Sequence, residues 1–141
     1  MSAIDVFADI SGWGNLVDPS QKHHAQAATL YRDIRRQGGK FITTNYVINE
    51  LVALFTSPLR LPREKTIAFI DAMKMSAYVE IVQIDMSLDV EAWEMLKQFR
   101  DKDWSLVDCS SFVLMKRRGI AQAWTHEHHF EQAGFVRMLG D

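Results

Sequence analysis

The sequence predicts an α/β domain built on a mostly parallel sheet, and three observations support this. The chain has 141 residues, which at roughly 150 residues per domain is the length of one domain. Short, nearly continuous apolar runs recur along it, as expected of strands buried on both faces. Longer segments with helical periodicity separate these runs, and such alternation favours parallel strands joined by right-handed crossovers. We therefore expect residues 1–141 to form a single domain.

The expected strands are short and evenly distributed. The first is the run from Ile4 to Ala8, which ends at Asp9. The others are expected at 41–43, 78–84, 120–124 and 135–139.

The expected helices fill the intervals between these strands. Their apolar stripes recur every three or four residues, and glycine or proline marks most of their ends. A turn at Asp18-Pro19-Ser20 precedes the first, Pro62 suits a first helical position, and Ser87 suits a cap. The helix opened by Ser105 is apolar all round from Phe112 to Met115, so we expect it to be buried. The expected helical segments are 27–34, 47–55, 62–73, 87–99 and 105–118.

Composition excludes several classes of protein. Apolar residues make up 48% and charged residues 24%, which argues against a mainly disordered chain. The net charge of −2 argues against nucleic-acid binding through overall positive charge. Cys109 is the only cysteine, so an intrachain disulfide and a cysteine metal cluster are excluded. No apolar run approaches the ~20 residues of a membrane span and no signal peptide is visible, so we expect a cytoplasmic protein.

Acidic residues fall where the expected strands end. Ligands of open parallel sheets bind beyond the carboxyl ends of the strands. Asp9 follows the first strand, and Thr44 and Asn45 follow the second and open the helix that carries Glu50. Asp108 lies in the first turn of the buried helix, and Glu127 follows the fourth strand by three residues. The topology thus brings four acids to one rim.

Clustered carboxylates are costly to bury unless a cation joins them. Oxygen ligands without cysteine favour Mg²⁺ or Mn²⁺. Such ions activate water and hold a phosphodiester for in-line attack. We therefore expect Asp9, Glu50 and Asp108 to bind metal, with Glu127 completing a catalytic set.

Each acid also has a structural interpretation. Asp9 suits a helix cap, and Glu50 and Glu127 suit a solvated surface. Ser105-x-x-Asp108 also reads as a capping box. The joint placement is more informative than any one position.

Several segments resemble, in order and with matching spacing, the motifs of the PIN-domain nucleases, the family that includes VapC-type toxins. Asp9-Ile10-Ser11-Gly12-Trp13 is similar to the family's opening motif, and the stretch from Asp18 to Ala25 to the element that follows it. The segments 43–51, 103–112 and 124–135 resemble the remaining motifs. Ile10 and Glu127 depart from the usual Thr and Asp.

The resemblance implies a three-layer α/β/α, flavodoxin-like sandwich with about five strands. It implies an Mg²⁺- or Mn²⁺-dependent endoribonuclease acting on tRNA, rRNA or mRNA, restrained by an antitoxin, and commonly a homodimer. Ser11 and Thr44 would orient the carboxylates, while Asp103 and Asn45 rank lower as site residues. The basic residues Arg60, Arg63 and Lys65 are candidates to line a channel between two sites.

Other interpretations remain open from the sequence alone. The same rim suits a flavodoxin-like binding module, or a catalytically inactive PIN-like scaffold in which Glu127 marks lost activity. His126, His128 and His129 invite a zinc site, but three histidines this close rarely converge on one ion. For the antitoxin we expect an arginine that pairs with the carboxylates and an amphipathic helix in an apolar groove between segments 47–55 and 67–73.

Overall fold

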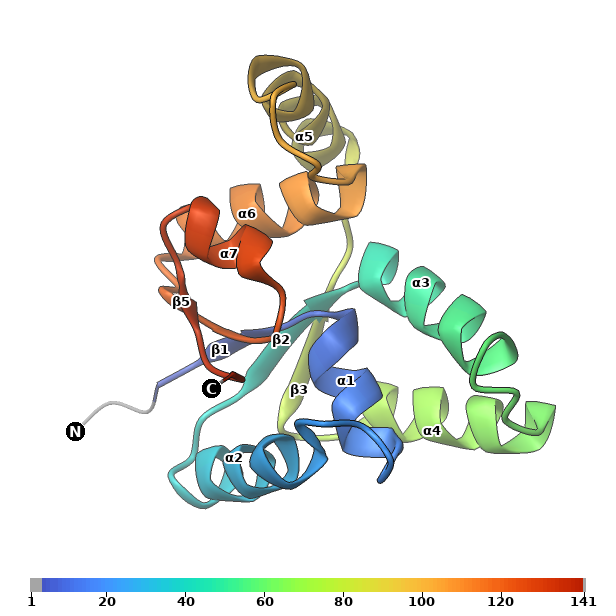
Figure 1. Cartoon of the computed structure of the whole chain (residues 1–141). Coiled ribbons are helices and arrows are strands. Elements are labelled where there is room, and N and C mark those ends of the chain that lie inside the picture. Colours follow the sequence, from blue (N-terminus) through green and yellow to red (C-terminus); the bar gives the residue numbers. More distant parts are fainter. Residues whose placement is uncertain (1–3, 141) are drawn as a thin grey trace.

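The computed structural model describes residues 4–140 and is built around a five-stranded sheet with the order β3-β2-β1-β4-β5. Every pairing is parallel, as the alternation of strands and helices predicts. Figure 1 shows the sheet passing between two groups of helices. The strands are β1 (Val6–Ala8), β2 (Phe41–Thr44), β3 (Val79–Val82), β4 (Gln122–Trp124) and β5 (Val136–Arg137).

The helices form the two outer layers. Those that connect β1 to β2 and β2 to β3 lie on one side, and those that follow β3 and β4 lie on the other (Figure 1). The first group is α1 (Ile10–Val17), α2 (His24–Arg36), α3 (Asn45–Thr56) and α4 (Arg63–Met75). The second is α5 (Met86–Gln98), α6 (Leu106–Arg118) and α7 (His128–Gln132). The predicted three-layer sandwich is therefore present.

The direction of the crossovers reverses beside β1. The chain moves from β1 outward through β2 to β3, then returns to β4 on the other side of β1. Ligands of doubly wound sheets bind at such a switch point, outside the carboxyl ends of the strands. The segments that follow β1 and β4 begin at Asp9 and Thr125.

The buried helix α6 has the ends that the sequence predicts. Ser105 and Asp108 form a capping box at its start, and Gly119 ends it with φ of 67°, a left-handed conformation that favours glycine. The run from Cys109 to Met115 is buried throughout. Asp108 is thus fixed at the start of a helix that packs into the core.

Two helices were not expected from the sequence. No element was assigned to the region of α1, where Gly12 and Gly14 lower helix propensity. Gly12 is nevertheless required there, since a Cβ atom on it would lie 2.3 Å from the carbonyl oxygen of Trp124. The helix α7 was not predicted because it is short and has no apolar stripe.

Several predicted boundaries differ from the structure. The first strand covers only residues 6–8, the third 79–82, the fourth 122–124 and the fifth 136–137. The cap of α5 is Asp85, whose side chain accepts from the Leu88 backbone, so the prediction of Ser87 was wrong. Pro62 lies at the N-cap rather than inside α4, and α2 begins at His24, after the Asp18 turn. Local patterns locate elements well but bound them poorly.

Among residues 4–140, no helix combines the length and the apolar character needed to cross a membrane.

Candidate active site

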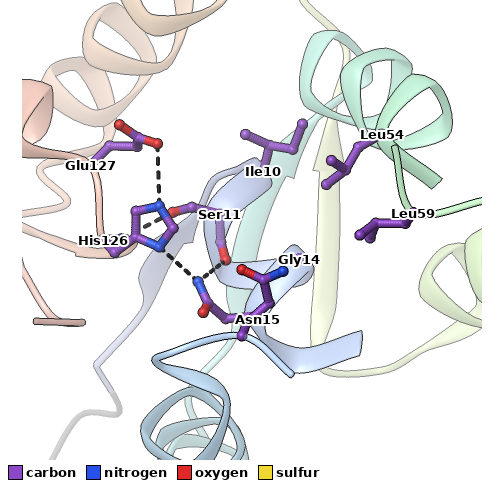
Figure 2. A pocket seen from close by; sticks show the side chains of 9 residues that line it. Ile10, Ser11, Gly14, Asn15, Leu54, Leu59, His126 and Glu127 are labelled. Atoms are coloured by element: carbon purple, nitrogen blue, oxygen red, sulfur yellow. Dashed lines mark hydrogen bonds and ion pairs between the residues drawn. The ribbon is translucent and has the colours of Figure 1, made fainter. Parts of the chain in front are cut away.

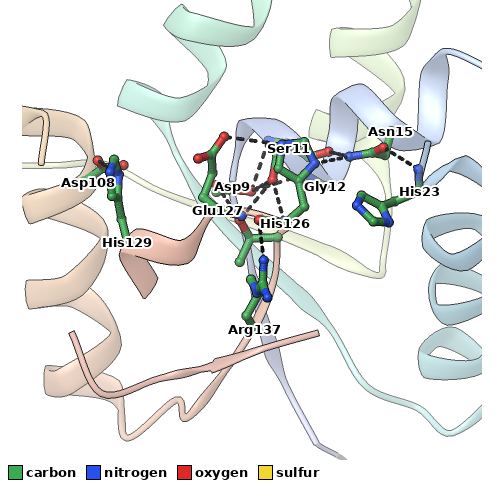
Figure 3. Close-up of polar contacts among 11 residues, drawn as sticks. Asp9, Ser11, Gly12, Asn15, His23, Asp108, His126, Glu127, His129 and Arg137 are labelled. Atoms are coloured by element: carbon green, nitrogen blue, oxygen red, sulfur yellow. Dashed lines mark hydrogen bonds and ion pairs between the residues drawn. The ribbon is translucent and has the colours of Figure 1, made fainter. Parts of the chain in front are cut away.

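Asp9 is held rigidly at the end of β1. Its side chain caps α1, with Oδ1 accepting from the Ser11 backbone at 3.0 Å, the Ser11 hydroxyl at 2.9 Å and the Gly12 backbone at 3.2 Å. Oδ2 accepts from the Thr125 hydroxyl at 2.8 Å. Only 5% of Asp9 is exposed, and this burial raises its pKa to about 6 despite the hydrogen bonds from Thr125 and Ser11, which lower it. Figure 3 shows this network joining the start of α1 to the segment after β4.

Glu50 enters the same site from α3. Its pKa is raised to about 7, first by burial and then by the charges of Asp108, Asp9 and Glu127. These three acids come from α6, the residue directly after β1 and the segment after β4. The charges of all three act on Glu50, so the four predicted carboxylates lie at the same side of the fold.

Asp108 has the capping role considered from the sequence and also faces a histidine of α7. Its Oδ2 accepts from the Ser105 backbone at 3.1 Å, which completes the capping box. The same oxygen lies 3.1 Å from Nδ1 of His129 on α7. Figure 3 shows this pair apart from the Asp9 group, where α6 and α7 meet. Since both contacts fall on Oδ2, the Oδ1 atom retains its capacity to bind a cation.

Glu127 is connected to a histidine and an asparagine. Nε2 of His126 lies 3.4 Å from Oε1 of Glu127, and the hydrogen bond from His126 lowers the pKa of Glu127. On the other side of the ring, Nδ1 of His126 lies 2.8 Å from Nδ2 of Asn15. The Asn15 amide also donates to the Ser11 carbonyl oxygen and accepts from the His23 backbone. Its nitrogen must therefore donate to Nδ1, which places the proton of a neutral His126 on Nε2, facing Glu127.

The residues ranked below the four acids have varied surroundings. Ser11 orients Asp9 directly, as the resemblance implies. Thr44 is fully buried and accepts from the Val47 backbone, so it caps the helix that carries Glu50. Asn45 accepts from the Ile84 backbone and so connects α3 to the segment after β3. Asp103 is exposed and is not among the charges that shift the pKa of Glu50.

Two residues near the acids, Thr125 and Asn15, were not singled out from the sequence, and a third, His129, was considered for a zinc site. Thr125 donates to Asp9 and accepts from the Glu127 backbone, while Asn15 fixes His126 and His129 faces Asp108. Thr125 could have been found from its position directly after β4, by the same rule that selects Asp9. No comparable local signal points to Asn15, because its helix was not predicted.

The donor set fits a hard divalent cation. The four carboxylates offer oxygen ligands, and their mutual repulsion, evident in the raised pKa of Glu50, is what a cation would relieve. Within the described part of the chain, no three His, Cys, Asp or Glu side chains are close enough together to form a closed ligand set.

The sequence matches the family model of the PIN domain over residues 6–136. The chain therefore belongs to the PIN-domain family, and the predicted family and fold are confirmed. The match spans the elements that carry all four acids, from β1 to β5.

Its relatives include toxins of this family from Mycobacterium tuberculosis. The chain is 27% identical over 133 residues to the 23S rRNA-specific endonuclease VapC20 of two strains, CDC 1551 / Oshkosh and H37Rv, with 94% of this chain and 97% of the relative covered. The crystal structure of M. tuberculosis VapC20, described as a sarcin-ricin loop cleaving toxin, superposes with a TM-score of 0.84 at 25% identity. That superposition covers 96% of this chain and 99% of VapC20.

Proposed function

We propose that the protein is a metal-dependent endoribonuclease, the toxin of a toxin–antitoxin pair. The observation that carries this is the convergence of Asp9, Glu50, Asp108 and Glu127, from four separate elements, on the switch point of a PIN fold. The full-length similarity to an rRNA endonuclease supports RNA, and ribosomal RNA first, as the substrate class. We place this activity in the cytoplasm.

In this mechanism Asp9, Glu50 and Asp108 would hold Mg²⁺ or Mn²⁺, and the bound ion would supply Lewis-acid chemistry: activation of a water and neutralisation of charge on the phosphodiester. Asp9 is the fixed ligand, because its carboxylate is held by α1 and Thr125. Oδ2 of Asp9 accepts one hydrogen bond, so it keeps acceptor capacity for a cation. Glu127 lies at the same rim, charged beside His126, and completes the catalytic set.

Cleavage of RNA by the purified protein tests this proposal. We expect cuts in a ribosomal RNA hairpin with Mg²⁺ or Mn²⁺ and none with EDTA. Asp108→Asn should abolish cleavage while keeping the cap of α6, because Ser105 remains the N-cap and the asparagine side-chain oxygen can still accept from the Ser105 backbone. Cleavage that persists in EDTA or in Asp108→Asn would overturn the assignment.

A catalytically inactive scaffold is not favoured, because this chain aligns along nearly its whole length with a protein named as an endonuclease. The alternative has its own test. If the protein is inactive because Glu127 replaces an aspartate, Glu127→Asp should create or greatly raise cleavage. Cleavage by the wild-type protein would exclude the scaffold alternative.

We also propose an antitoxin partner and a homodimer. An apolar hollow between α3 and α4, lined by Val52, Ile67 and Ile70, is suited to the antitoxin's amphipathic helix. An arginine of the antitoxin would pair with the acid cluster and displace metal. An arginine-to-alanine antitoxin that binds but does not inhibit would support this mechanism, and equal inhibition would contradict it.

The exposed residues Arg60, Arg63 and Lys65 are the candidates to line a channel between the two subunits. If light scattering shows a monomer at micromolar concentration, the proposal of a homodimer is wrong.

A further inference from the structure

An open hollow of about 200 Å³ adjoins the acid cluster. It lies between α1, the end of α3 and the segment after β4 (Figure 2). Ser11 and Glu127 line it and also belong to the acid site, so the two are continuous. A substrate phosphate at the carboxylates would therefore place its neighbouring nucleotide at the mouth of this hollow.

The walls of the hollow are mainly apolar. Ile10, Leu54 and Leu59 form one part, and Figure 2 shows Leu54 and Leu59 facing Ile10 across it. Leu59 is held there because its backbone N–H donates to the Leu54 carbonyl oxygen at 3.2 Å. The hollow is thus shaped by ordered side chains.

His126 supplies a flat aromatic wall. Nδ1 of its ring is engaged by Asn15 and Nε2 by Glu127, as Figure 2 also shows. With both nitrogens engaged, the His126 ring offers a ligand its carbon atoms rather than a free hydrogen-bonding nitrogen, and the His23 ring lies beside it with the centroids 5.6 Å apart. An aromatic ring with fixed orientation is the kind of surface on which a nucleobase stacks.

Gly14 keeps the hollow open. Glycine inside a helix costs about 1 kcal/mol relative to alanine. At Gly12 the backbone of Trp124 forbids any side chain, but at Gly14 a Cβ atom would meet only the flexible tip of Leu54, at 3.3 Å. Core packing therefore does not require a glycine at position 14. A glycine is required there only if the hollow beside Leu54 is to stay open.

We propose that this hollow is a subsite for one unstacked nucleobase next to the scissile phosphate. The inference rests on the proposed ribonuclease function and specifies how that site selects its RNA. The base inserts between the aliphatic wall and His126, while its phosphate lies at the carboxylates. Gly14 and Leu54 are the residues that set the size of the base accepted.

The first test uses a short RNA hairpin that the protein cleaves, with single abasic nucleotides placed on either side of the cut. We expect wild-type kcat/KM to fall about tenfold for one abasic position, the equivalent of one lost stacking contact. On intact RNA, Gly14→Val should have a kcat/KM about tenfold below that of the wild type. On the abasic RNA the two proteins should differ by less than about twofold, because the base that the variant excludes is already absent. Ala53→Val, on an exposed position of α3, is the matched control and should behave as wild type.

The second test does not depend on cleavage. The four nucleoside 5′-monophosphates are titrated without divalent ions, and the methyl NMR signals of Ile10, Leu54 and Leu59 are followed. At least one nucleotide should shift these signals in the wild type and not in Gly14→Val. Gly14→Ala, which adds a single carbon, should give an intermediate effect and guards against misfolding of the valine variant.

The outcomes separate this subsite from the proposed function. Nucleotide binding without any RNA cleavage would leave the subsite standing and contradict the nuclease proposal. Cleavage without methyl shifts and without an abasic effect would overturn the subsite. A Gly14→Val variant that cleaves like wild type but escapes its antitoxin would show that the hollow takes a protein side chain, which also overturns it.

Discussion

Asp9 and Glu50 are two carboxyl groups of the candidate site, the first buried and the second half-buried, and the structure holds them in different ways. Asp9 accepts hydrogen bonds from α1 on one oxygen and from Thr125 on the other. Glu50 projects from the middle of α3, and its strongest influences after burial are the charges of three other acids. Asp9 is thus fixed by hydrogen bonds, whereas the charged form of Glu50 is disfavoured by burial and by its acidic neighbours. If both bind metal as proposed, Asp9 would be the rigid ligand and Glu50 the one whose ionisation depends on the cation.

The largest effect should come from removing the charge of the rigid ligand. Asp9→Asn should lower metal-dependent cleavage by about three orders of magnitude, because a ligand worth several kcal/mol of charge stabilisation is lost. Urea unfolding should show little loss of stability, since asparagine still caps α1. Asp9→Ala should lose the activity and also about 1 kcal/mol of stability. An active Asp9→Asn would remove Asp9 from the metal site.

Glu50→Gln should have the next largest effect, with cleavage reduced about 100-fold through weaker metal binding. Unlike Asp9→Asn, it should raise the stability of the metal-free protein at pH 8, because it removes a charge repelled by its neighbours. Isothermal titration with Mg²⁺ and thermal unfolding measure the two effects. Unchanged metal affinity would show that Glu50 is not a ligand.

Thr125→Val should reduce cleavage about tenfold, at the lower end of the effects of residues that orient metal ligands. It keeps the shape of the side chain but removes the donor to Oδ2 of Asp9 and the acceptor of the Glu127 backbone. Thr125→Ser should restore most of the activity. If valine and serine behave alike, the hydroxyl does not position Asp9.

The stability of the metal-free protein should fall as the pH rises from about 4 to 8. The pKa of Asp9 is raised from 3.8 to about 6 and that of Glu50 from 4.5 to about 7, so between these values the folded protein binds more protons than the unfolded chain. The stabilisation is present in full at the lower pH and is lost as each group ionises.

Thermal unfolding with and without Mg²⁺ checks the sign of this pH dependence. Mg²⁺ should stabilise the protein more at pH 8 than at pH 5.5, because protonated carboxyl groups bind it poorly. Glu50→Gln should flatten the metal-free curve between pH 6 and 8. A stability that rises over this range would contradict the burial of both acids.

The smallest effect is expected at Asp103. This residue is exposed, outside the charges that act on Glu50, so Asp103→Asn should change cleavage by less than about twofold, as for a solvated charge. It is the matched control for Asp9 and Glu50. A large loss would extend the site toward the start of α6.

The accuracy of the sequence predictions depends on the range of the interactions involved. The alternating pattern predicts the parallel sheet, and the capping box at Ser105 is a local motif that the structure reproduces. The helix at 10–17 was missed because two glycines obscure it, while its stability comes from the Asp9 cap and the burial of Trp13. A rule based on neighbouring residues cannot include the stabilisation that a helix gains by packing against residues far away in the chain.

The sequence by itself determined that the four acids follow strands or lie on the helices after them, because the alternation of strands and helices follows from local periodicity. Only the tertiary structure decided how they are held. Thr125 reaches Asp9 across 116 positions of the chain, and Asn15 reaches His126 across 111. It also decided that Gly14 opens onto a hollow while Gly12 is closed against Trp124. These properties depend on which distant surfaces meet, and that is fixed by packing of the whole core rather than by the spacing of residues along one element.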